Sequence, residues 1–574
     1  MKEMQLYELW KEKAREDEDL VRELAEVAGD ENGIYDRFYR ELEFGTAGLR
    51  GVLGAGSNRM NIYTVRKTTQ GIAQYLKERY DAPSVAISYD SRIKSDLFAR
   101  EAARVLAANG VKAYLTHELM PTPMLSFAVR DNRCQVGIMI TASHNPAKYN
   151  GYKVYGPDGC QMTSESADAV YDIMSTLDIF SDVKIADYDK AVADGSIVII
   201  GDEIYPRYLD KVYEQRVDLQ AFEGCDVKVV YTPLNGTGNK PVRMILDRVG
   251  LKNVTIVSEQ ELPDGNFTTC PYPNPEIREA LQLGLDLCEK VHPDILLATD
   301  PDADRVGTAV YDGEKYVLLT GNEMGVLLLD YIAGCKTKLG TMPKNPIAVK
   351  SIVTTKLADA VAKEYGVELV EVLTGFKYIG EQILHLEEKG ECQRFLFGFE
   401  ESYGYLSGTY VRDKDAVVAS MLICEMVAHY KKQGISLAQK MEELYGKYGR
   451  YLNSIDNFAF EGAAGMQKMD EMMESLRANS PKEIAGWNVE RFVDYKRSEG
   501  YTLEAGEKKP FAVTLPTSNV LEYNLENGSS LIVRPSGTEP KIKLYYTAKG
   551  ADLEDAKGIT KQLSQSAAKM MGLA

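Results

Sequence analysis

The sequence predicts three similar α/β domains with mixed sheets, followed by a C-terminal α+β domain, all arranged around one cleft. Three observations favour this fold class. The chain has 574 residues, which is long for a single hydrophobic core. Before about residue 450, apolar strands and amphipathic helices alternate in one pattern that occurs three times. After that point, strands joined by a short turn replace the alternation.

The first copy of the pattern lies in a domain that we place at residues 1–205. Its strands are expected at 85–89, 111–115 and 136–140. An amphipathic helix follows the first strand and stops at Gly110, because glycine commonly ends helices.

The second copy lies in a domain that we place at residues 206–322. Its strands are expected at 227–231, 254–257 and 295–298, with helical segments between them. Apolar strands separated by amphipathic helices indicate a sheet that helices cover on both faces.

The third copy lies in a domain that we place at residues 323–450. Strands are expected at 346–353, 367–372 and 394–399, again with helices between them. The same pattern in all three domains predicts the same layered architecture for each of them.

The C-terminal domain, which we place at residues 451–574, has a different pattern. Its strands are expected at 519–525, 530–533 and 541–548, and a turn separates the first two. A helix over 551–571 would cover one face of this antiparallel meander.

The charge of the chain bears on its partners. The 85 acidic residues exceed the 67 lysines and arginines, so the formal net charge is −18. A nucleic-acid-binding protein needs a basic face for phosphates, so we expect no nucleic-acid partner. A small molecule with a phosphate group is compatible with this charge if basic residues gather at its site.

Apolar residues and cysteines are distributed as in a cytoplasmic protein. No apolar run reaches the ~20 residues that span a bilayer, so no membrane partner is expected. Residues 1–20 are charged throughout and lack the apolar segment of a secretory signal. The eight cysteines are scattered without a CxxC pair, which is typical of reduced thiols.

A polar loop follows the last strand of each copy, and ligands of open α/β sheets gather at the carboxyl ends of strands. In the loop at 141–146, Ser143 stands beside His144, and Lys153 follows further along. A hydroxyl near an imidazole and a cation suggests chemistry, although a plain Asn-Pro turn is the alternative. The absence of GxSxG around Ser143 argues against a hydrolase nucleophile of the elbow type.

The second loop carries Asp300, Asp302 and Asp304 at alternate positions. An extended loop can bring such carboxylates together on one hard cation, and carboxylates without a full cage suit Mg²⁺. An EF-hand calcium loop is excluded, because Arg305 stands where glycine is required and Tyr311 where a glutamate is required. A solvated acidic turn is the remaining alternative.

The third loop, at 398–404, contains the acidic pair Glu400 and Glu401. This pair can be ordinary surface charge. Its position after a strand favours recognition of sugar hydroxyls, because carboxylates accept hydrogen bonds from them. Lys414 supplies a cation close by in the sequence.

The fourth loop is suited to phosphate. Arg534 offers a guanidinium fork, Ser536 and Thr538 offer hydroxyls, and Gly537 lets the backbone approach a ligand closely. A hairpin turn is the alternative. Arg50 adds a further cation from the segment GTAGLRG. The basic residues that a phosphate ligand requires are therefore present where loops are expected to converge.

These four loops, in this order, resemble the α-D-phosphohexomutase family across essentially the whole chain. TASHNP with NGYK looks like its phosphoserine loop, DPDADR like its metal loop, GFEESYG like its sugar loop and RPSGTEP like its phosphate loop. The resemblance implies a four-domain enzyme in which the serine carries a phosphoryl group and Mg²⁺ is bound.

The resemblance also implies a role for each matching residue. The catalytic group would be Ser143, His144, Lys153 and Arg50. The Mg²⁺ ligands would be Ser143, Asp300, Asp302 and Asp304. The residues that contact the substrate would be Arg305, Gly375, Phe376, Glu400, Ser402, Lys414, Arg534, Ser536, Gly537 and Thr538.

Within the family, FGTAGLRG, TGFKYIG, GFEESYG and RDKDA look most like the bacterial α-phosphoglucomutases and the related phosphopentomutases. Members similar to phosphomannomutases usually have histidines at two positions that Phe376 and Gly404 occupy here. Phosphoglucosamine mutases typically read DGDGDR, which this chain lacks. These departures disfavour mannose and leave the acid–base group open.

The activity that the resemblance implies is reversible interconversion of glucose 1-phosphate and glucose 6-phosphate. It would run through a phosphoserine enzyme and glucose 1,6-bisphosphate, which is both intermediate and activator. Lys153 is our candidate for the general base, supported by His144. The alternatives are phosphopentomutase, phosphomannomutase or glucose 1,6-bisphosphate synthase activity, a serine phosphatase and a non-catalytic sugar-phosphate-binding protein. The partners would be sugar phosphates, and the chain would be a monomer or a homodimer.

Overall fold

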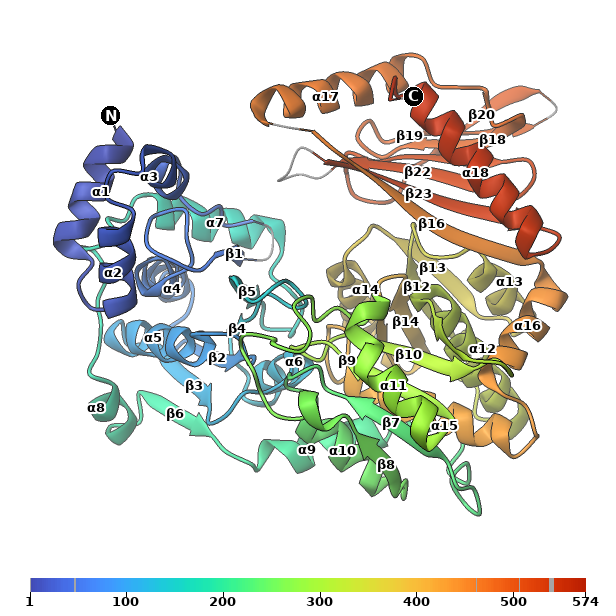
Figure 1. Ribbon diagram of the computed structural model, residues 1–574, viewed down its shortest axis with the longest axis horizontal. Coiled ribbons are helices and arrows are strands. Elements are labelled where there is room, and N and C mark those ends of the chain that lie inside the picture. The colour runs from blue at the N-terminus through green and yellow to red at the C-terminus, as the bar shows by residue number, and fades with distance from the viewer. Residues whose placement is uncertain (1, 46–47, 461, 505, 536–540, 574) are drawn as a thin grey trace. The chain divides into compact units, whose positions relative to one another are not determined.

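The computed structural model (Figure 1) describes residues 2–45, 48–460, 462–504, 506–535 and 541–573. Contacts divide the chain into two compact units, which are described separately. The first comprises residues 1–321 and 376–436, and the second comprises 322–375 and 437–574. Among the described residues, no helix combines the length and the apolar character that crossing a membrane requires.

Three helices that the sequence pattern did not predict open the first unit: α1 (Lys2–Lys13), α2 (Glu18–Glu26) and α3 (Glu31–Phe38). Their side chains pack on the rest of the unit through Trp10, which is 1% exposed. The Trp10 ring makes edge contacts with Phe38 and Tyr63.

The first sheet has the strand order β1-β5-β4-β2-β3-β6. Its strands are β1 (Gly48–Val52), β2 (Ser84–Tyr89), β3 (Lys112–Thr116), β4 (Val136–Ile140), β5 (Tyr149–Tyr155) and β6 (Ile197–Ile200). The helices of this domain are α4 (Ile62–Lys77), α5 (Ser95–Ala108), α6 (Thr122–Asp131), α7 (Ser164–Ser175), α8 (Tyr188–Ala193) and α9 (Ile204–Tyr213). β2, β3, β4 and β6 are parallel, whereas β1 and β5 run antiparallel to their neighbours. The sheet is therefore mixed, as expected.

The second sheet has the strand order β11-β10-β9-β7-β8. Its strands are β7 (Lys228–Thr232), β8 (Asn253–Ile256), β9 (Ile295–Thr299), β10 (Val306–Tyr311) and β11 (Tyr316–Leu319). The helices are α10 (Asn239–Arg248) and α11 (Gln282–Val291). β7, β8 and β9 are parallel, and β10 and β11 are antiparallel, so this sheet is also mixed.

The third set of elements contributes to both units. In the second unit, α12 (Gly321–Leu339) precedes the parallel pair β12 (Ile347–Ser351) and β13 (Glu368–Val372), and α13 (Leu357–Glu364) connects that pair. In the first unit, β14 (Phe395–Glu400) and β15 (Gly404–Leu406) form an antiparallel pair. The helices α14 (Phe376–Glu388) and α15 (Ala416–Lys431) flank the pair in sequence, and α16 (Leu437–Tyr448) begins the rest of the second unit.

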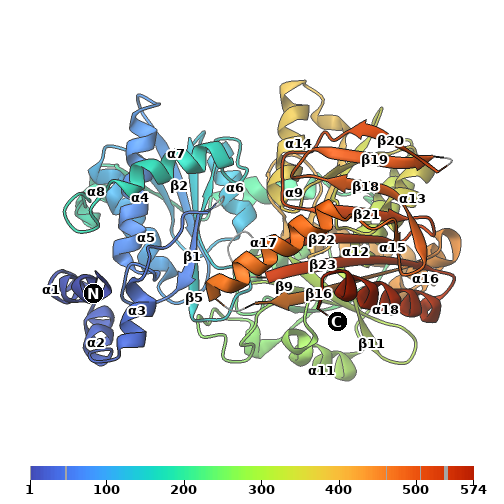
Figure 2. The same ribbon diagram turned by 90° about the horizontal axis from the view of Figure 1, so that it is seen from above.

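The C-terminal sheet is larger than the predicted meander. Within the described residues it has eight strands, ordered β16-β23-β22-β21-β18-β19-β20 with β17 paired to β18. The strands are β16 (Arg450–Ala459), β17 (Glu483–Ile484), β18 (Trp487–Asp494), β19 (Glu499–Glu504), β20 (Glu507–Ala512), β21 (Leu521–Leu525), β22 (Ser530–Pro535) and β23 (Lys541–Gly550). Both views show α17 (Gly462–Ala478) and α18 (Leu553–Met570) on one face of the sheet (Figures 1 and 2). The α+β class is confirmed; the boundaries assigned to the four domains and the single cleft stay predictions.

A buried carboxylate connects the C-terminal sheet to the β12–β13 segment within the second unit. Glu522 on β21 has a side chain that is 1% exposed. It accepts hydrogen bonds from the Tyr495 hydroxyl at 2.6 Å and from Arg491 Nη1 at 2.9 Å. Lys356 Nζ lies 3.9 Å from the same carboxylate and donates to Glu371 on β13. The negative charge of Glu522 is therefore buried, and these partners stabilise it.

Replacing Glu522 by alanine should lower the free energy of unfolding of the second unit by roughly 1–3 kcal/mol, because the Tyr495 hydroxyl and the partly exposed Arg491 lose their acceptor. Glu490→Ala, an exposed change on the adjacent strand β18, should stay within about 0.5 kcal/mol. Denaturation can be followed through Trp487, which is the single tryptophan once Trp10 is replaced by phenylalanine. Equal denaturation midpoints for the two variants would show that Glu522 does not stabilise the second unit.

Candidate active site

The loop that carries Ser143 follows a completely buried strand. β4 ends at Ile140, and the next residues turn sharply, because Ser143 adopts a left-handed backbone conformation with φ 53°. Its backbone N–H donates to Thr141 Oγ1 at 2.8 Å, and the Thr141 hydroxyl donates to Asp90 Oδ2 at 2.6 Å. This conformation is uncommon for a residue other than glycine, so the surrounding contacts must hold it.

The Ser143 hydroxyl faces two candidate partners. It donates to Asp300 Oδ2 at 3.1 Å, and His144 Nδ1 lies 3.2 Å away. Burial, together with the positive charges of Arg305 and Arg50, lowers the pKa of His144 to about 2. The imidazole is therefore neutral at physiological pH and can accept a hydrogen bond from the serine.

The three aspartates follow β9 and are all buried. Asp300, Asp302 and Asp304 are at most 1% exposed, and each offers a carboxylate oxygen within 4.8 Å of the others. Asp302 Oδ1 and Asp304 Oδ1 are buried and have no hydrogen-bond partner among the residues that the structure describes. Such orphaned anionic oxygens are costly unless a cation binds them, so this donor set fits a divalent cation with a preference for oxygen ligands.

The backbone shapes the aspartate loop around Asp300. Its Oδ1 accepts hydrogen bonds from the N–H groups of Asp304 at 3.1 Å and Arg305 at 3.0 Å. Burial and the charges of Asp302 and Asp304 raise the pKa of Asp300 well above its usual value. The loop therefore concentrates like charges, which an ion of opposite charge would relieve.

Lys153 reaches these aspartates from β5. That strand pairs with β4 so that Lys153 faces Met139, and its Nζ lies 2.7 Å from Asp302 Oδ2 and 3.7 Å from Asp304 Oδ2. Burial lowers the pKa of Lys153, but the two carboxylates outweigh burial and leave this pKa above its ordinary value. Lys153 is therefore an ammonium group in this arrangement.

Two further cations adjoin the aspartates. Lys414 Nζ lies 3.1 Å from both Asp304 Oδ2 and Asp413 Oδ1, and it stands over the ring of Phe376 at 5.4 Å from the centroid. Arg305 donates to Glu276 Oε1 at 2.5 Å. The structure thus brings Ser143, His144, Lys153, Asp300, Asp302, Asp304, Arg305, Phe376 and Lys414 into one neighbourhood of the first unit.

The predicted sugar loop closes the β14–β15 pair beside this cluster. Glu400 is the last residue of β14 and is 5% exposed, and Ser402 lies in the turn that follows. Arg305 forms a β-bridge with Gly404, which connects the aspartate loop to this turn. A Cβ at Gly404 would lie 2.0 Å from Lys414 Cδ, so the lysine stem occupies the space that a larger side chain would need.

The remaining predicted residues have less defined surroundings. Arg50 is exposed on β1, where it pairs with Gly151 of β5. Gly375 has φ 125°, a conformation that favours glycine. Arg534 is half-buried on β22, and its Nη1 donates to the Tyr545 hydroxyl at 3.4 Å. Ser536, Gly537 and Thr538 lie outside the described residues.

Sequence reasoning missed several residues that shape this site. Thr122, at the start of α6, donates its hydroxyl to Asp302 Oδ2 at 2.9 Å. Glu276 pairs with Arg305, and Asp413 pairs with Lys414. Asp90 directly follows β2, so the rule about the carboxyl ends of parallel strands could have found it. For Thr122 and Glu276, no local pattern indicated a role.

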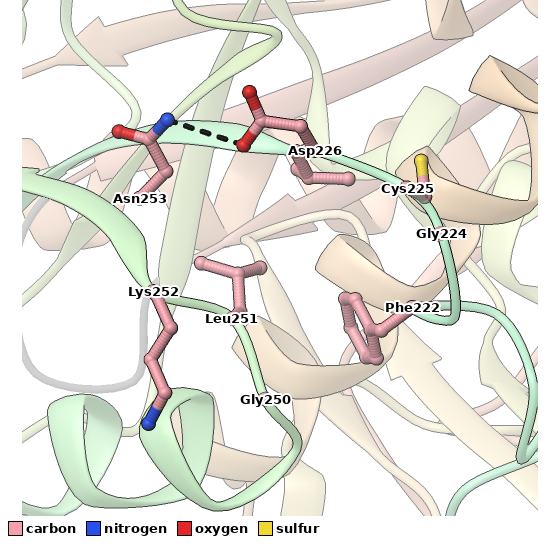
Figure 3. Close-up of a pocket in the computed structure, with 9 residues that line it drawn as sticks. Phe222, Gly224, Cys225, Asp226, Gly250, Leu251, Lys252 and Asn253 are labelled. Atoms are coloured by element: carbon pink, nitrogen blue, oxygen red, sulfur yellow. Dashed lines mark hydrogen bonds between the residues drawn. The ribbon is translucent and has the colours of Figure 1, made fainter.

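A surface pocket lies at the other end of the second sheet (Figure 3). Its lining comes from residues 222 and 224–227, which precede β7, and from residues 250–253, which lead into β8 and include its first residue. Asn253 donates to Asp226 Oδ1 at 3.2 Å across it. β7 and β9 are parallel, the pocket lies where β7 begins, and the aspartate loop lies where β9 ends. The two are therefore at opposite ends of the strands. The pocket is therefore separate from the candidate site.

Comparison with protein families extends over most of the chain. The models for phosphoglucomutase/phosphomannomutase match alpha/beta/alpha domain I at residues 41–179, domain II at 206–313, domain III at 320–448 and the C-terminal domain at 481–563.

Curated relatives match over nearly their whole length. A phosphoglucomutase of Staphylococcus saprophyticus is 37% identical over 96% of this chain and 98% of its own. A phosphoglucomutase of Staphylococcus haemolyticus is 37% identical over 89% of this chain and 91% of its own.

Two solved structures share the fold. One is a putative phosphomannomutase from Thermus thermophilus, with TM-score 0.67 and 24% identity over 93% of this chain and 99% of that one. The other is parafusin, a phosphoglucomutase from Paramecium, with TM-score 0.68 and 18% identity over 93% and 96%.

Fold, site and matches together define an enzyme of the isomerase class that transfers phosphoryl groups. The chain belongs to the phosphoglucomutase/phosphomannomutase family, which confirms the resemblance to the α-D-phosphohexomutases.

Proposed function

We propose that this chain is a phosphoglucomutase, which reversibly converts α-D-glucose 1-phosphate into glucose 6-phosphate. The observation that carries the proposal is the contact of Ser143 Oγ with Asp300 Oδ2 at 3.1 Å. The Ser143 hydroxyl, which would be the nucleophile, thus adjoins a buried cluster of three carboxylates and two lysines. The staphylococcal relatives named phosphoglucomutase support glucose phosphates as the substrates.

In the proposed reaction, Ser143 carries a phosphoryl group and donates it to the 6-hydroxyl of glucose 1-phosphate. A P–O bond forms at the sugar oxygen while the bond between phosphorus and Ser143 Oγ breaks, which gives glucose 1,6-bisphosphate. The bisphosphate then turns over, and its 1-phosphoryl group passes to Ser143 Oγ. Glucose 6-phosphate leaves, and phosphoserine is restored. Glucose 1,6-bisphosphate is thus both intermediate and activator.

The residues around Ser143 would manage the charge of this reaction. We propose that Ser143, Asp300, Asp302 and Asp304 hold Mg²⁺, which supplies neutralising charge to the transferring group when it is bound. Lys153, Lys414 and Arg305 would hold phosphoryl oxygens by charge-assisted hydrogen bonds. Arg50, which lies on the strand next to Lys153, would add a further cation.

Proton transfer would involve Lys153. It holds its proton beside Asp302 and Asp304, so in each transfer it would donate that proton to the departing oxygen, which is Ser143 Oγ in the first transfer and the sugar 1-oxygen in the second. It would then take up the proton of the attacking hydroxyl, which is the sugar 6-hydroxyl in the first transfer and the Ser143 hydroxyl in the second. His144, which is neutral and 3.2 Å from Ser143 Oγ, would orient that hydroxyl.

The substrate would be held at both ends. Glu400 would accept hydrogen bonds from sugar hydroxyls, and Ser402 would accept or donate them. Gly375 and Phe376 would form a further contact with the sugar. Arg534, with Ser536, Gly537 and Thr538, would bind the phosphate that does not react. Glucose 1-phosphate and glucose 6-phosphate would each place the non-reacting phosphate at these four residues. One site would therefore accept both substrates.

Replacing Arg534 by alanine should weaken binding of both glucose phosphates by ~1.5–3 kcal/mol, which is the range for hydrogen bonds to charged groups. Steady-state kinetics in both directions should show the loss as a raised KM. Arg497→Ala, a change at an exposed arginine of the same domain, serves as the control. Unchanged kinetics for both substrates would place the non-reacting phosphate elsewhere.

The preference for glucose over mannose has one structural support. The stem of Lys414 fills the space beside Gly404, so a histidine at that position would require Lys414 to move. Values of kcat/KM for glucose, mannose and ribose 1-phosphates, measured side by side, test the assignment. A ribose value well above the glucose value would favour phosphopentomutase instead. Net formation of glucose 1,6-bisphosphate would favour a synthase, and stoichiometric release of inorganic phosphate would favour a phosphatase.

We further propose that sugar phosphates are the partners and that the cytoplasm is the compartment. All eight cysteines are free thiols, which supports a reducing environment. The oligomeric state is proposed as monomer or homodimer, and light scattering distinguishes the two.

A further inference from the structure

Arg92 is a buried arginine that has no role in the proposed reaction. It binds the loop that carries Ser143. The Arg92 side chain is 0% exposed. Its Nη2 donates to the carbonyl oxygens of Ser143 and Asn145, both at 2.5 Å. Its Nη1 donates to the carbonyl oxygens of Pro146 and Tyr149, both at 3.1 Å. One guanidinium thus binds four carbonyls between residues 143 and 149.

Asp90 orients this guanidinium and also contacts the loop. Its Oδ2 lies 3.1 Å from Arg92 Nε and accepts the Thr141 hydroxyl at 2.6 Å. Thr141 Oγ1 in turn accepts the backbone N–H of Ser143 at 2.8 Å. The N–H of Ser143 is therefore fixed through Thr141 and Asp90, while its carbonyl is fixed by Arg92.

A loop of the second domain, which carries Phe267, packs against the guanidinium of Arg92. Arg92 Cζ lies 5.0 Å from the centroid of the Phe267 ring. A Cβ at Gly265 would lie 2.7 Å from the backbone N of Ile93, so the loop that carries Phe267 packs closely against the residues next to Arg92. Because the space around it is filled, Arg92 has little freedom to move away from the carbonyls.

We infer that Arg92 is a positioning residue: it holds Ser143 in its left-handed conformation, so that Oγ faces Asp300. The conformation with φ 53° is unfavourable by itself and needs such support. Backbone carbonyls are bound by geometry as well as by charge, and a lysine cannot reproduce four directed donors from one planar group. The catalytic consequence rests on the proposed function, because it requires Ser143 to be the phosphoryl carrier.

The test compares Arg92→Lys with Arg66→Lys. Arg66 is a matched control in the same domain, since it is buried and paired with Glu101 and Glu16 but does not touch the serine loop. The first readout is kinetic. Misplacing a nucleophile by about 1 Å costs on the order of 100-fold in rate, so we expect kcat of Arg92→Lys to fall ~100-fold. KM should stay within about 2-fold, because the completely buried Arg92 side chain would not contact the substrate.

The second readout is hydrogen exchange, which needs no activity. In Arg92→Lys, the amides of Ser143, Asn145 and Tyr149 should exchange roughly 10-fold faster than in the wild type, whereas Arg66→Lys should leave them unchanged. Unchanged exchange at these amides, or a kcat loss no larger than in Arg66→Lys, overturns the inference. An inactive wild type with faster loop exchange in Arg92→Lys would instead refute the proposed function and keep the positioning role.

Discussion

Replacing Ser143 by alanine should abolish mutase activity while leaving the fold intact. Activity is expected to fall by on the order of 10⁴-fold or more, because the proposed covalent intermediate forms on Ser143. The unfolding transition should hardly move, because the left-handed backbone strain is similar for serine and alanine. Coupled assays of glucose 6-phosphate formation give the activity, and circular dichroism gives the stability.

Glucose 1,6-bisphosphate separates the role of Ser143 from a general loss of function. It should reactivate a dephosphorylated wild-type enzyme, since it can donate a phosphoryl group to the serine. It should have no effect on Ser143→Ala. Ser175→Ala, a change at an exposed serine of the same domain, should behave like the wild type. Normal turnover by Ser143→Ala would mean that the phosphoryl group travels by another route.

Replacing Asp302 by asparagine should reduce kcat by at least ~100-fold. The change removes an anionic ligand of the proposed Mg²⁺ site and the negative charge that lies 2.7 Å from Lys153 Nζ. Isothermal titration with Mg²⁺ should show weaker binding, and excess Mg²⁺ should restore activity only in part. Asp312→Asn, a change at an exposed aspartate after β10, is the matched control.

Chelation gives an independent check of the metal assignment. Wild-type activity should disappear in excess chelator and return when Mg²⁺ is added. If a preparation shown to be free of metal kept full activity in chelator, the aspartate cluster would need another explanation, such as a role in pairing Lys153 and Lys414.

The parts of the fold that the sequence predicted are those with strong local patterns. The strand at 136–140 was evident because every residue in it is apolar, and the structure buries them all. By contrast, β20 contains three charged residues and a proline, and it is a strand only because it pairs with β19. β16 and β23 pair along ten residues although they are distant in sequence, and no local propensity encodes such a partner.

The residues of the candidate site also separate into those that local patterns predicted and those that they did not. Ser143 and the three aspartates follow apolar strands, so the rule about strand ends identified them. Arg92 was missed because its partners are backbone carbonyls more than fifty residues away, as for Ser143 at a separation of 51. Glu276 was missed because its significance depends on the position of Arg305 in three dimensions. Motifs predict which groups react, whereas the supporting contacts come from the folded chain.

The most direct test of this account is to locate the covalent phosphate. Dephosphorylated enzyme is incubated with glucose 1,6-bisphosphate, digested and analysed by peptide mass spectrometry. We predict one phosphoryl group per chain, on Ser143. When that group carries an isotopic label, excess glucose 1-phosphate added in a rapid-quench experiment should move the label from Ser143 to the sugar phosphate. A chain that gains no phosphate, or that carries it on a residue outside the loop at 141–146, would contradict the phosphoserine mechanism.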